Sequence, residues 1–324
     1  MKTAGSADSR SPQPYSHSAV CLEALMDKFY KKWFLPLAIP AIILFVGVIL
    51  IPFIVGVFYS FTGWRGTYFV GGGSNPFAAI VGISNYTKAF NSEKFIDALV
   101  YTVKYTLIAV VWINIVGLTL ALLVTKIVKG AGIFRTIFFM PNLLGGLALG
   151  FIWAFIFEVV FSQFIFNKDG ILNLPFLTNM TQDNTKALFA LLILVTWQMG
   201  GYLMLIYVNG LNSIPTALFE AAKIDGANAI QTFIHVTVPM LMPAFTITFF
   251  LTLANSFKLL DQNIALTDGS FGTRMLATQI LRTTRDTSPP DYGMAQAQAV
   301  IFFVLIAVVT LVQVYVTKKR EVEA

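Results

Sequence analysis

Charged residues divide the chain into long stretches that contain no Asp, Glu, Lys or Arg. Six of these stretches are predominantly apolar and at least 21 residues long, at positions 34–64, 105–125, 136–157, 187–219, 226–257 and 292–317. A helix needs about 20 apolar residues to cross a bilayer. Because a bilayer offers no water to backbone amides, and the stretches lack the alternation of barrel strands, each is predicted to be a helix. The pattern predicts an all-α membrane protein with six transmembrane helices.

The composition agrees with this class, since 56% of the 324 residues are hydrophobic, 12% are charged and the mean hydropathy is +0.74. The first apolar stretch follows three lysines and is far longer than the core of a secretory signal, so we expect it to remain in the mature chain. Residues 1–27 are rich in Ser and Pro and are predicted to form a disordered tail. Residues 28–324 then form the transmembrane domain.

The distribution of basic residues gives a weak orientation signal. If both termini are cytoplasmic, the inside segments carry 12 of the 22 Lys and Arg residues. The other basic residues are spread over longer loops that also hold 9 of the 16 acids. Since cytoplasmic loops are enriched in Lys and Arg, the density favours cytoplasmic termini in a multi-pass membrane protein.

A segment of small residues separates the fourth and fifth apolar stretches and reads EAAKIDGANAIQTFIHVTVP at positions 220–239. The side chains of Ala221 and Ala222 are small enough for a partner to approach the backbone closely. Gly226 tolerates a positive φ and can end a short helix. Asn228 and Gln231 have the spacing of a capping box, which predicts a second helix. Helix, glycine turn, helix is the expected structure of this loop, about 213–239, and its expected role is docking.

No arrangement of residues suggests catalysis. His17 and His235 lack a metal-ligand spacing, Cys21 is the single cysteine, and a phosphate-binding GxxxxGK[ST] sequence is absent. No Ser, Cys or acid pair has a setting that suggests a nucleophile or a general base. The chain is predicted not to be an enzyme, with no cofactor, no metal site and no nucleic-acid partner.

The centres of the apolar stretches carry amides, hydroxyls and aromatics in place of charges. Proton-coupled pumps and paths for charged solutes usually keep ionisable residues inside the membrane, so a neutral solute is favoured. A polyhydroxylated solute would use amides for its hydroxyls and aromatic rings for its C–H faces. The candidate pathway residues are Trp197, Gln198, Tyr202, Thr252, Asn255 and Ser256. The alternative for each is an interhelical hydrogen bond that only holds helices together.

The small-residue loop resembles the EAA loop of membrane subunits of ATP-binding-cassette importers. That family's pattern is EAA, three residues, G, nine residues, then I-x-L-P, and here Val236 and Val238 replace Ile and Leu. The carbohydrate-uptake branch is also matched by GISNY at residues 82–86, by Phe257 and Lys258 with Asp261, and by Tyr292 with Gly293. The chain is most similar to the first of two paired permeases, the maltose-permease F-type half.

The resemblance implies a type I importer fold in a bacterial cell membrane. It also implies a heterodimer with a second permease, two cytoplasmic ATP-binding subunits and an extracellular solute-binding protein. The residues expected to contact the ATPase are Glu220, Ala221, Ala222, Asp225 and Gly226. The expected function is to form half of a path for a sugar or oligosaccharide, with glycerol phosphate or another small polar solute as the alternative cargo. A stand-alone secondary transporter is the alternative of another class.

Overall fold

The computed structural model describes residues 33–71, 73–126, 130–168 and 170–321. The predicted tail, residues 1–27, lies outside this range. Within the described residues the regular structure is helical, apart from isolated β-bridges such as the one between Thr62 and Ile80. Contacts divide the chain into two units, Met1–Phe58 and Tyr59–Ala324. The first unit contributes most of the first long helix, and the second contains the remaining helices.

The predicted all-helical membrane fold is confirmed. Five helices of the described chain are long and apolar enough to span a membrane, namely Trp33–Ser60, Glu93–Thr125 (α4), Gly146–Ile165 (α6 with η4), Asn184–Asn212 (α7) and Tyr292–Lys318 (α14). A sixth span is formed if the bent pair Ala229–Met240 and Met242–Phe257 is counted as one. Each overlaps one of the six predicted stretches, although the third span begins ten residues later than its stretch because a short helix and a turn precede it.

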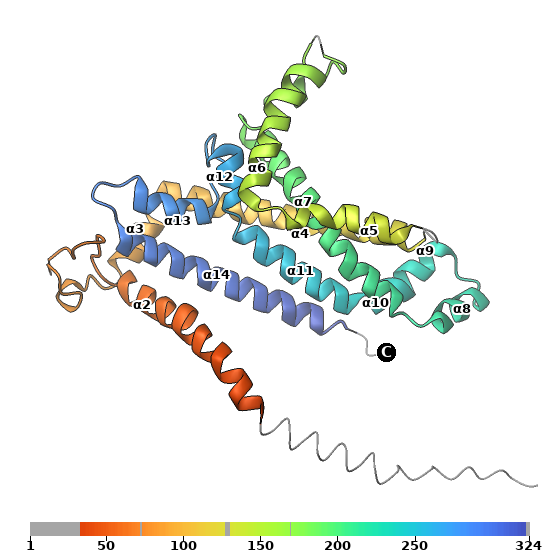
Figure 1. Cartoon of the computed structure of the whole chain (residues 1–324), viewed down its shortest axis with the longest axis horizontal. Helices are drawn as coiled ribbons and strands as arrows, with labels where there is room; N and C mark the ends of the chain where they lie inside the picture. Colours follow the sequence, from red (N-terminus) through yellow and green to blue (C-terminus); the bar gives the residue numbers. More distant parts are fainter. Residues whose placement is uncertain (1–32, 72, 127–129, 169, 322–324) are drawn as a thin grey trace, which may run out of the picture. The chain divides into compact units, whose positions relative to one another are not determined.

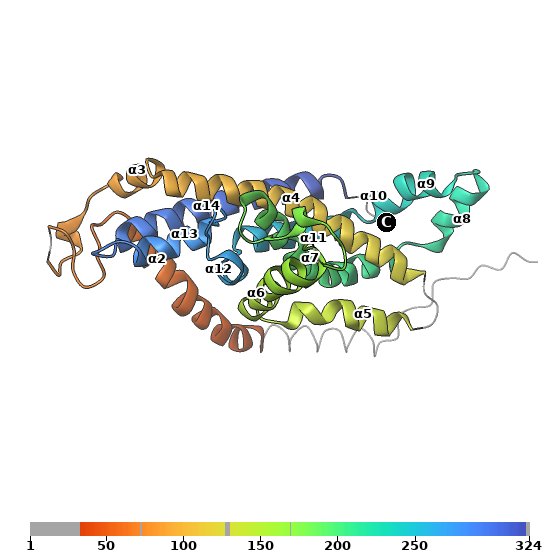
Figure 2. The same ribbon diagram turned by 90° about the horizontal axis from the view of Figure 1, so that it is seen from above.

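Short elements connect the spans. They are η2 (Phe77–Ala79), α3 (Ser84–Phe90), α5 (Ala131–Phe139), η3 (Met140–Leu143), η5 (Pro175–Leu177), α8 (Thr216–Ile224), α9 (Ala229–Thr232), η6 (Phe233–Thr237), α10 (Val238–Met240), α12 (Asp261–Thr267) and α13 (Leu276–Arg285). Helix α11 (Met242–Phe257) completes the bent span. The first long helix includes η1 (Val46–Leu50) and α2 (Ile51–Ser60). In the second unit, α8 and α9 lie at one end and α3 and α13 at the other (Figures 1 and 2).

The core of the second unit forms where α4 packs against α7 and α11. A buried polar network joins these three helices. The Tyr207 hydroxyl donates to Asn114 Oδ1 at 2.8 Å and accepts from Thr248 Oγ1 at 2.8 Å. Asn114 Nδ2 donates in turn to Thr252 Oγ1 at 3.2 Å. All four side chains are almost fully buried, so their polar groups need hydrogen-bond partners within the protein, and here several of these partners lie on a neighbouring helix.

The sharpest feature of the fifth span is a bend of 69° at Leu241. Pro239 and Pro243 flank this residue and have no N–H for the helical ladder, so the regular hydrogen bonding is interrupted there. Leu241 itself is fully buried. A Cβ added to Gly210 of α7 would approach Leu241 Cδ2 to 2.9 Å, so the bend is packed closely against α7.

The end of the second unit that holds α3 is organised around Gly293. Its N–H donates to the carbonyl of Trp64 at 2.9 Å, and an added Cβ would collide with the carbonyl of Thr62. Asn85 Nδ2 donates to the carbonyls of Ser60 and Thr62 at 2.8 and 2.9 Å. Two of the sequence runs that carry the family resemblance, residues 82–86 and 292–293, therefore meet here and hold the backbone that follows the first long helix.

Charged groups at the same end are paired. Arg65 Nη1 lies 2.8 Å from Asp291 Oδ2, and the Asp291 carboxylate also caps α14 by accepting from the N–H of Met294. Arg282 forms an ion pair with Asp268, and this hydrogen-bonded carboxylate raises the pKa of Arg282. The pair between Arg282 and Asp268 is close to the surface, so it contributes little to stability, whereas Arg65 and Asp291 are largely buried.

We predict that Tyr207→Phe lowers the free energy of unfolding by about 1 kcal/mol, because Asn114 Oδ1 then loses its buried donor. Tyr105→Phe is the matched control. Its hydroxyl is also buried but has no hydrogen-bond partner among the described residues, so its removal should cost nothing. Detergent-induced unfolding of the purified chain measures both variants. Equal destabilisation by the two substitutions would contradict a structural role for the network.

Candidate functional site

The small-residue loop has the predicted helix, turn, helix structure. Helix α8 ends in a Schellman motif, in which the N–H of Ala227 donates to the carbonyl of Ala222 at 2.9 Å and the N–H of Gly226 to that of Lys223 at 3.2 Å. Gly226 has φ +75° and open space around it, so a glycine is favoured there by backbone conformation and not by crowding. The turn is therefore well defined without support from other parts of the chain.

The second helix of the loop starts with the predicted capping box. Asn228 Oδ1 accepts from the N–H of Gln231 at 2.9 Å, and Gln231 Oε1 accepts from the N–H of Asn228 at 2.8 Å. Both helix ends at the turn are thus satisfied locally, which stiffens the loop. The helices continue into η6 and α10 toward Pro239, as the sequence predicts.

An open hollow of about 510 Å³ lies between α8 and the helix that follows it. Four of the five residues expected to contact the ATPase line it, namely Ala221, Ala222, Asp225 and Gly226. Glu220 is exposed on α8 and does not line the hollow. His235 also lines the hollow, and its Nδ1 lies 3.0 Å from the carbonyl of Gln231. The loop therefore presents a concave surface with small side chains.

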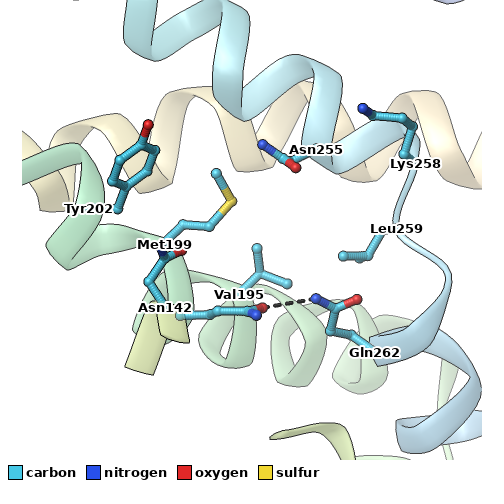
Figure 3. A pocket seen from close by; sticks show the side chains of 9 residues that line it. Asn142, Val195, Met199, Tyr202, Asn255, Lys258, Leu259 and Gln262 are labelled. Atoms are coloured by element: carbon cyan, nitrogen blue, oxygen red, sulfur yellow. Dashed lines mark hydrogen bonds between the residues drawn. The ribbon is translucent and has the colours of Figure 1, made fainter. Parts of the chain in front are cut away.

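A second hollow, a cavity of about 180 Å³, lies where α7, α11 and the segments next to them meet (Figure 3). Its polar lining consists of four amides, a phenol and an ammonium group, with Val195, Met199 and Leu259 as apolar neighbours. The polar members are Asn142, Gln198, Tyr202, Asn255, Lys258 and Gln262. No carboxylate of the described residues lines this cavity. The lining can therefore donate and accept hydrogen bonds without supplying a negative charge.

Helical periodicity explains which part of α7 faces the cavity. Four lining residues share one face of the helix, because three of them lie three, four and seven positions after Val195, at Gln198, Met199 and Tyr202. Gln198 is held in place because its Oε1 accepts from Gln262 Nε2 at 2.8 Å. Its own Nε2 donates to the carbonyl of Leu144 at 3.3 Å. Gln198 thus connects α7 to α12 and to the segment that precedes α6.

Three of the six predicted pathway residues, Gln198, Tyr202 and Asn255, line this cavity together. Trp197 does not, because its position in α7 is rotated by about 100° from that of Gln198. It lines a separate apolar groove of about 450 Å³ and packs edge-on against Trp153, with ring centroids 5.7 Å apart. The structure thus separates Trp197 from Tyr202 and the amide candidates.

Thr252 and Ser256 are fully buried in α11 and do not line the cavity. Thr252 belongs to the network with Asn114, and its own hydroxyl donates to the carbonyl of Thr248 at 2.7 Å. The interhelical alternative therefore describes the geometry of Thr252. Ser256 Oγ has no hydrogen-bond partner among the described residues.

Lys258 and Gln262 are site residues that the sequence analysis did not select. The predicted stretches were delimited by charged residues, so the fifth ended at Phe257, directly before Lys258. Lys258 follows Asn255 by three residues at the end of α11 and continues its face, so extending the periodicity of α11 by one residue would have found it. Gln262 belongs to α12, after a break in the helix, so the periodicity of α11 does not predict its position.

Comparisons with known proteins identify relatives of the chain. A family model described as "Binding-protein-dependent transport system inner membrane component" matches residues 113–322. The "Probable starch degradation products transport system permease protein AmyD" of Thermoanaerobacterium thermosulfurigenes is 41% identical over 300 residues, covering 91% of this chain and 98% of AmyD. The "Multiple sugar-binding transport system permease protein MsmF" of Streptococcus mutans is 33% identical over 294 residues, covering 90% and 97%.

The fold is also similar to that of a solved transporter. A chain in the crystal structure of "a bacterial ABC transporter involved in the import of the acidic polysaccharide alginate" superposes with a TM-score of 0.71. The two chains are 19% identical, and the match covers 91% of this chain and 98% of the other. At this identity the likeness concerns the fold alone.

Proposed function

This chain belongs to the binding-protein-dependent inner membrane transport components, and on that premise we propose how it handles its cargo. It is a multi-pass permease subunit of a sugar importer and not an enzyme. In the proposal, the cavity between α7 and α11 is part of the translocation path. The loop with α8 and α9 receives the ATPase. The observation that carries the proposal is the cavity lining, which is rich in amides and to which the described part of the chain contributes no carboxylate.

The proposed cargo is a neutral oligosaccharide of the kind released from starch. The substrate class named for AmyD supports this choice, as AmyD is 41% identical over nearly its whole length. Asn255 and Gln198 can donate to and accept from sugar hydroxyls, and the ring of Tyr202 offers a surface for C–H groups. A volume of about 180 Å³ is small beside the ~300 Å³ of ordinary ligand pockets, so the cavity would hold one part of an oligosaccharide at a time.

The partners follow from the family and from the geometry of the loop. A binding-protein-dependent system includes a solute-binding protein and an ATPase. We further propose that a second permease completes the path, as the resemblance to paired permeases implies, and that both termini are cytoplasmic. The concave surface lined by Ala221, Ala222 and Asp225 would then face the ATPase. A short helix pair fixed by a Schellman motif and a capping box can transmit movement as a rigid body.

For the cargo path, we predict that Asn255→Ala lowers uptake of a neutral maltooligosaccharide by roughly 5- to 150-fold, the equivalent of losing a buried polar partner worth about 1 to 3 kcal/mol. Radiolabelled uptake by the complex in liposomes measures the effect, with an assembly assay beside it. Trp197→Ala is the comparison, since Trp197 lines the apolar groove and should be less sensitive. If Trp197→Ala abolishes uptake while Asn255→Ala does not, the path lies along the other face of α7.

For coupling, we predict that Gly226→Val abolishes transport driven by ATP, because a β-branched residue does not adopt φ +75° without strain. Gly226→Asn is the matched control, since Asn tolerates the left-handed conformation and should retain most activity. ATP hydrolysis and uptake are measured on the same liposomes. Wild-type uptake in Gly226→Val would show that the conformation of the turn plays no part in coupling.

For topology, single cysteines at Ala229 and Ser270, in a Cys21→Ser background, should react with an impermeant maleimide from opposite sides of the membrane. Ala229 begins α9 beside the proposed ATPase surface, and Ser270 lies in the loop after α12. We expect Ser270→Cys to be labelled in intact cells and Ala229→Cys only after the membrane is opened. Labelling of both in intact cells would contradict the six-span arrangement with cytoplasmic termini.

A further inference from the structure

Lys258 is the charged residue of the cavity lining, and the proposed function gives it no task. It is exposed and forms the C-cap of α11, three residues after Asn255. No carboxylate of the described residues lies within ion-pair distance of its ammonium group, although Asp261 is only three residues away. The cavity therefore carries an uncompensated positive charge in a lining that is otherwise neutral.

We propose that Lys258 is a specificity residue that keeps cations out of the path. Its charge makes the cavity electrostatically positive, which rejects cationic sugars such as glucosamine oligomers and admits uncharged ones. This inference rests on the proposed function, because it concerns what enters the same cavity.

The physical basis is the repulsion between like charges at short range. A cation in the cavity lies close to the Lys258 ammonium group, and salt screens the repulsion fully only beyond about 10 Å. Fixed positive groups exclude cations and protons from other membrane pores by the same effect. The neighbouring amides cannot do this, because they interact with either sign of charge. An ammonium group also donates to hydroxyls, so a neutral sugar is not repelled.

A cation at the C-terminus of a helix also interacts favourably with the helix dipole, which is a purely structural use of Lys258. The two roles differ in their consequences. A structural role concerns the stability of α11, whereas a filter role sets the electrostatic potential at Asn255 and the charge of the ligands that bind. Lys258→Arg preserves both roles and Lys258→Gln removes both, so these substitutions alone do not separate them. The measurement must therefore report directly on the electrostatic potential in the cavity.

The test uses a reporter cysteine at Asn255 in the assembled complex, with Cys21 replaced by Ser. Modification rates are measured with one anionic and one cationic methanethiosulfonate reagent. Because both reagents attack the same thiol, the ratio of their rates cancels any change in its reactivity or exposure. We expect Lys258→Gln to lower the ratio of anionic to cationic rates by roughly tenfold. Lys258→Arg should keep the ratio. Lys223→Gln, which removes an exposed positive charge from α8, is the matched control and should also keep it.

Ligand protection then separates this inference from the proposed function. Because the reporter removes the Asn255 amide, maltotriose is added at a concentration raised roughly 150-fold to offset the weaker binding expected. At this concentration it should slow modification by an uncharged reagent in both the parent and Lys258→Gln. A glucosamine trimer should protect the Gln variant at least tenfold better than the parent. An unchanged rate ratio, or equal protection of both proteins by the glucosamine trimer, overturns the filter. A shifted ratio without protection by maltotriose would support the positive potential and contradict the proposed cargo path.

Discussion

The constraint on which this structure depends is the need to satisfy buried polar groups where no water is available. Asn114, Tyr207 and Thr248 meet it together, since each is the hydrogen-bond partner of a residue on another helix. Their network fixes the register of α4, α7 and α11. The cavity is built on two of these helices, α7 and α11. Tyr202 lies little more than one turn from Tyr207 on α7, and Asn255 lies about two turns from Thr248 on α11. The position of the cavity residues therefore follows from the network.

Helix α7 has two faces with different surroundings, because its polar side chains also need polar partners. The face with Gln198 and Tyr202 turns toward the polar cavity, whereas Trp197 and Gly201 line the apolar groove. Gly201 is necessary there because the backbone of Phe138 lies where a side chain would be. One helix can thus contact polar and apolar surroundings at once, because its residues are spaced by about 100°. A polar residue on such a helix therefore indicates a polar cavity only when the direction in which it faces around the helix axis is also known.

The fold was more predictable from the sequence than the site was. The apolar stretches predict the spans by their length and composition alone. The spacing of Gly226, Asn228 and Gln231 predicts the turn and the capping box, because both form between residues close together in the sequence. Which polar residues share a cavity depends on packing between helices, and here local signals were not enough. Thr252 looked like a cargo contact and bonds to Asn114. Lys258 was set aside as a boundary although it continues the face of Asn255.

The remaining question is how a loop at one end of the second unit can influence the cavity. The helices on both sides of the loop lead to the cavity, since α7 precedes α8 and α9 continues through η6 and α10 into α11. The bend at Leu241 is packed against Gly210, so the two routes are locked together close to the loop. A displacement of α8 and α9 would therefore move α7 and α11 as a pair and not slide one along the other. Because Gln198 and Asn255 lie on those two helices, such a movement would reach both sides of the cavity, which is what coupling by rigid-body motion requires.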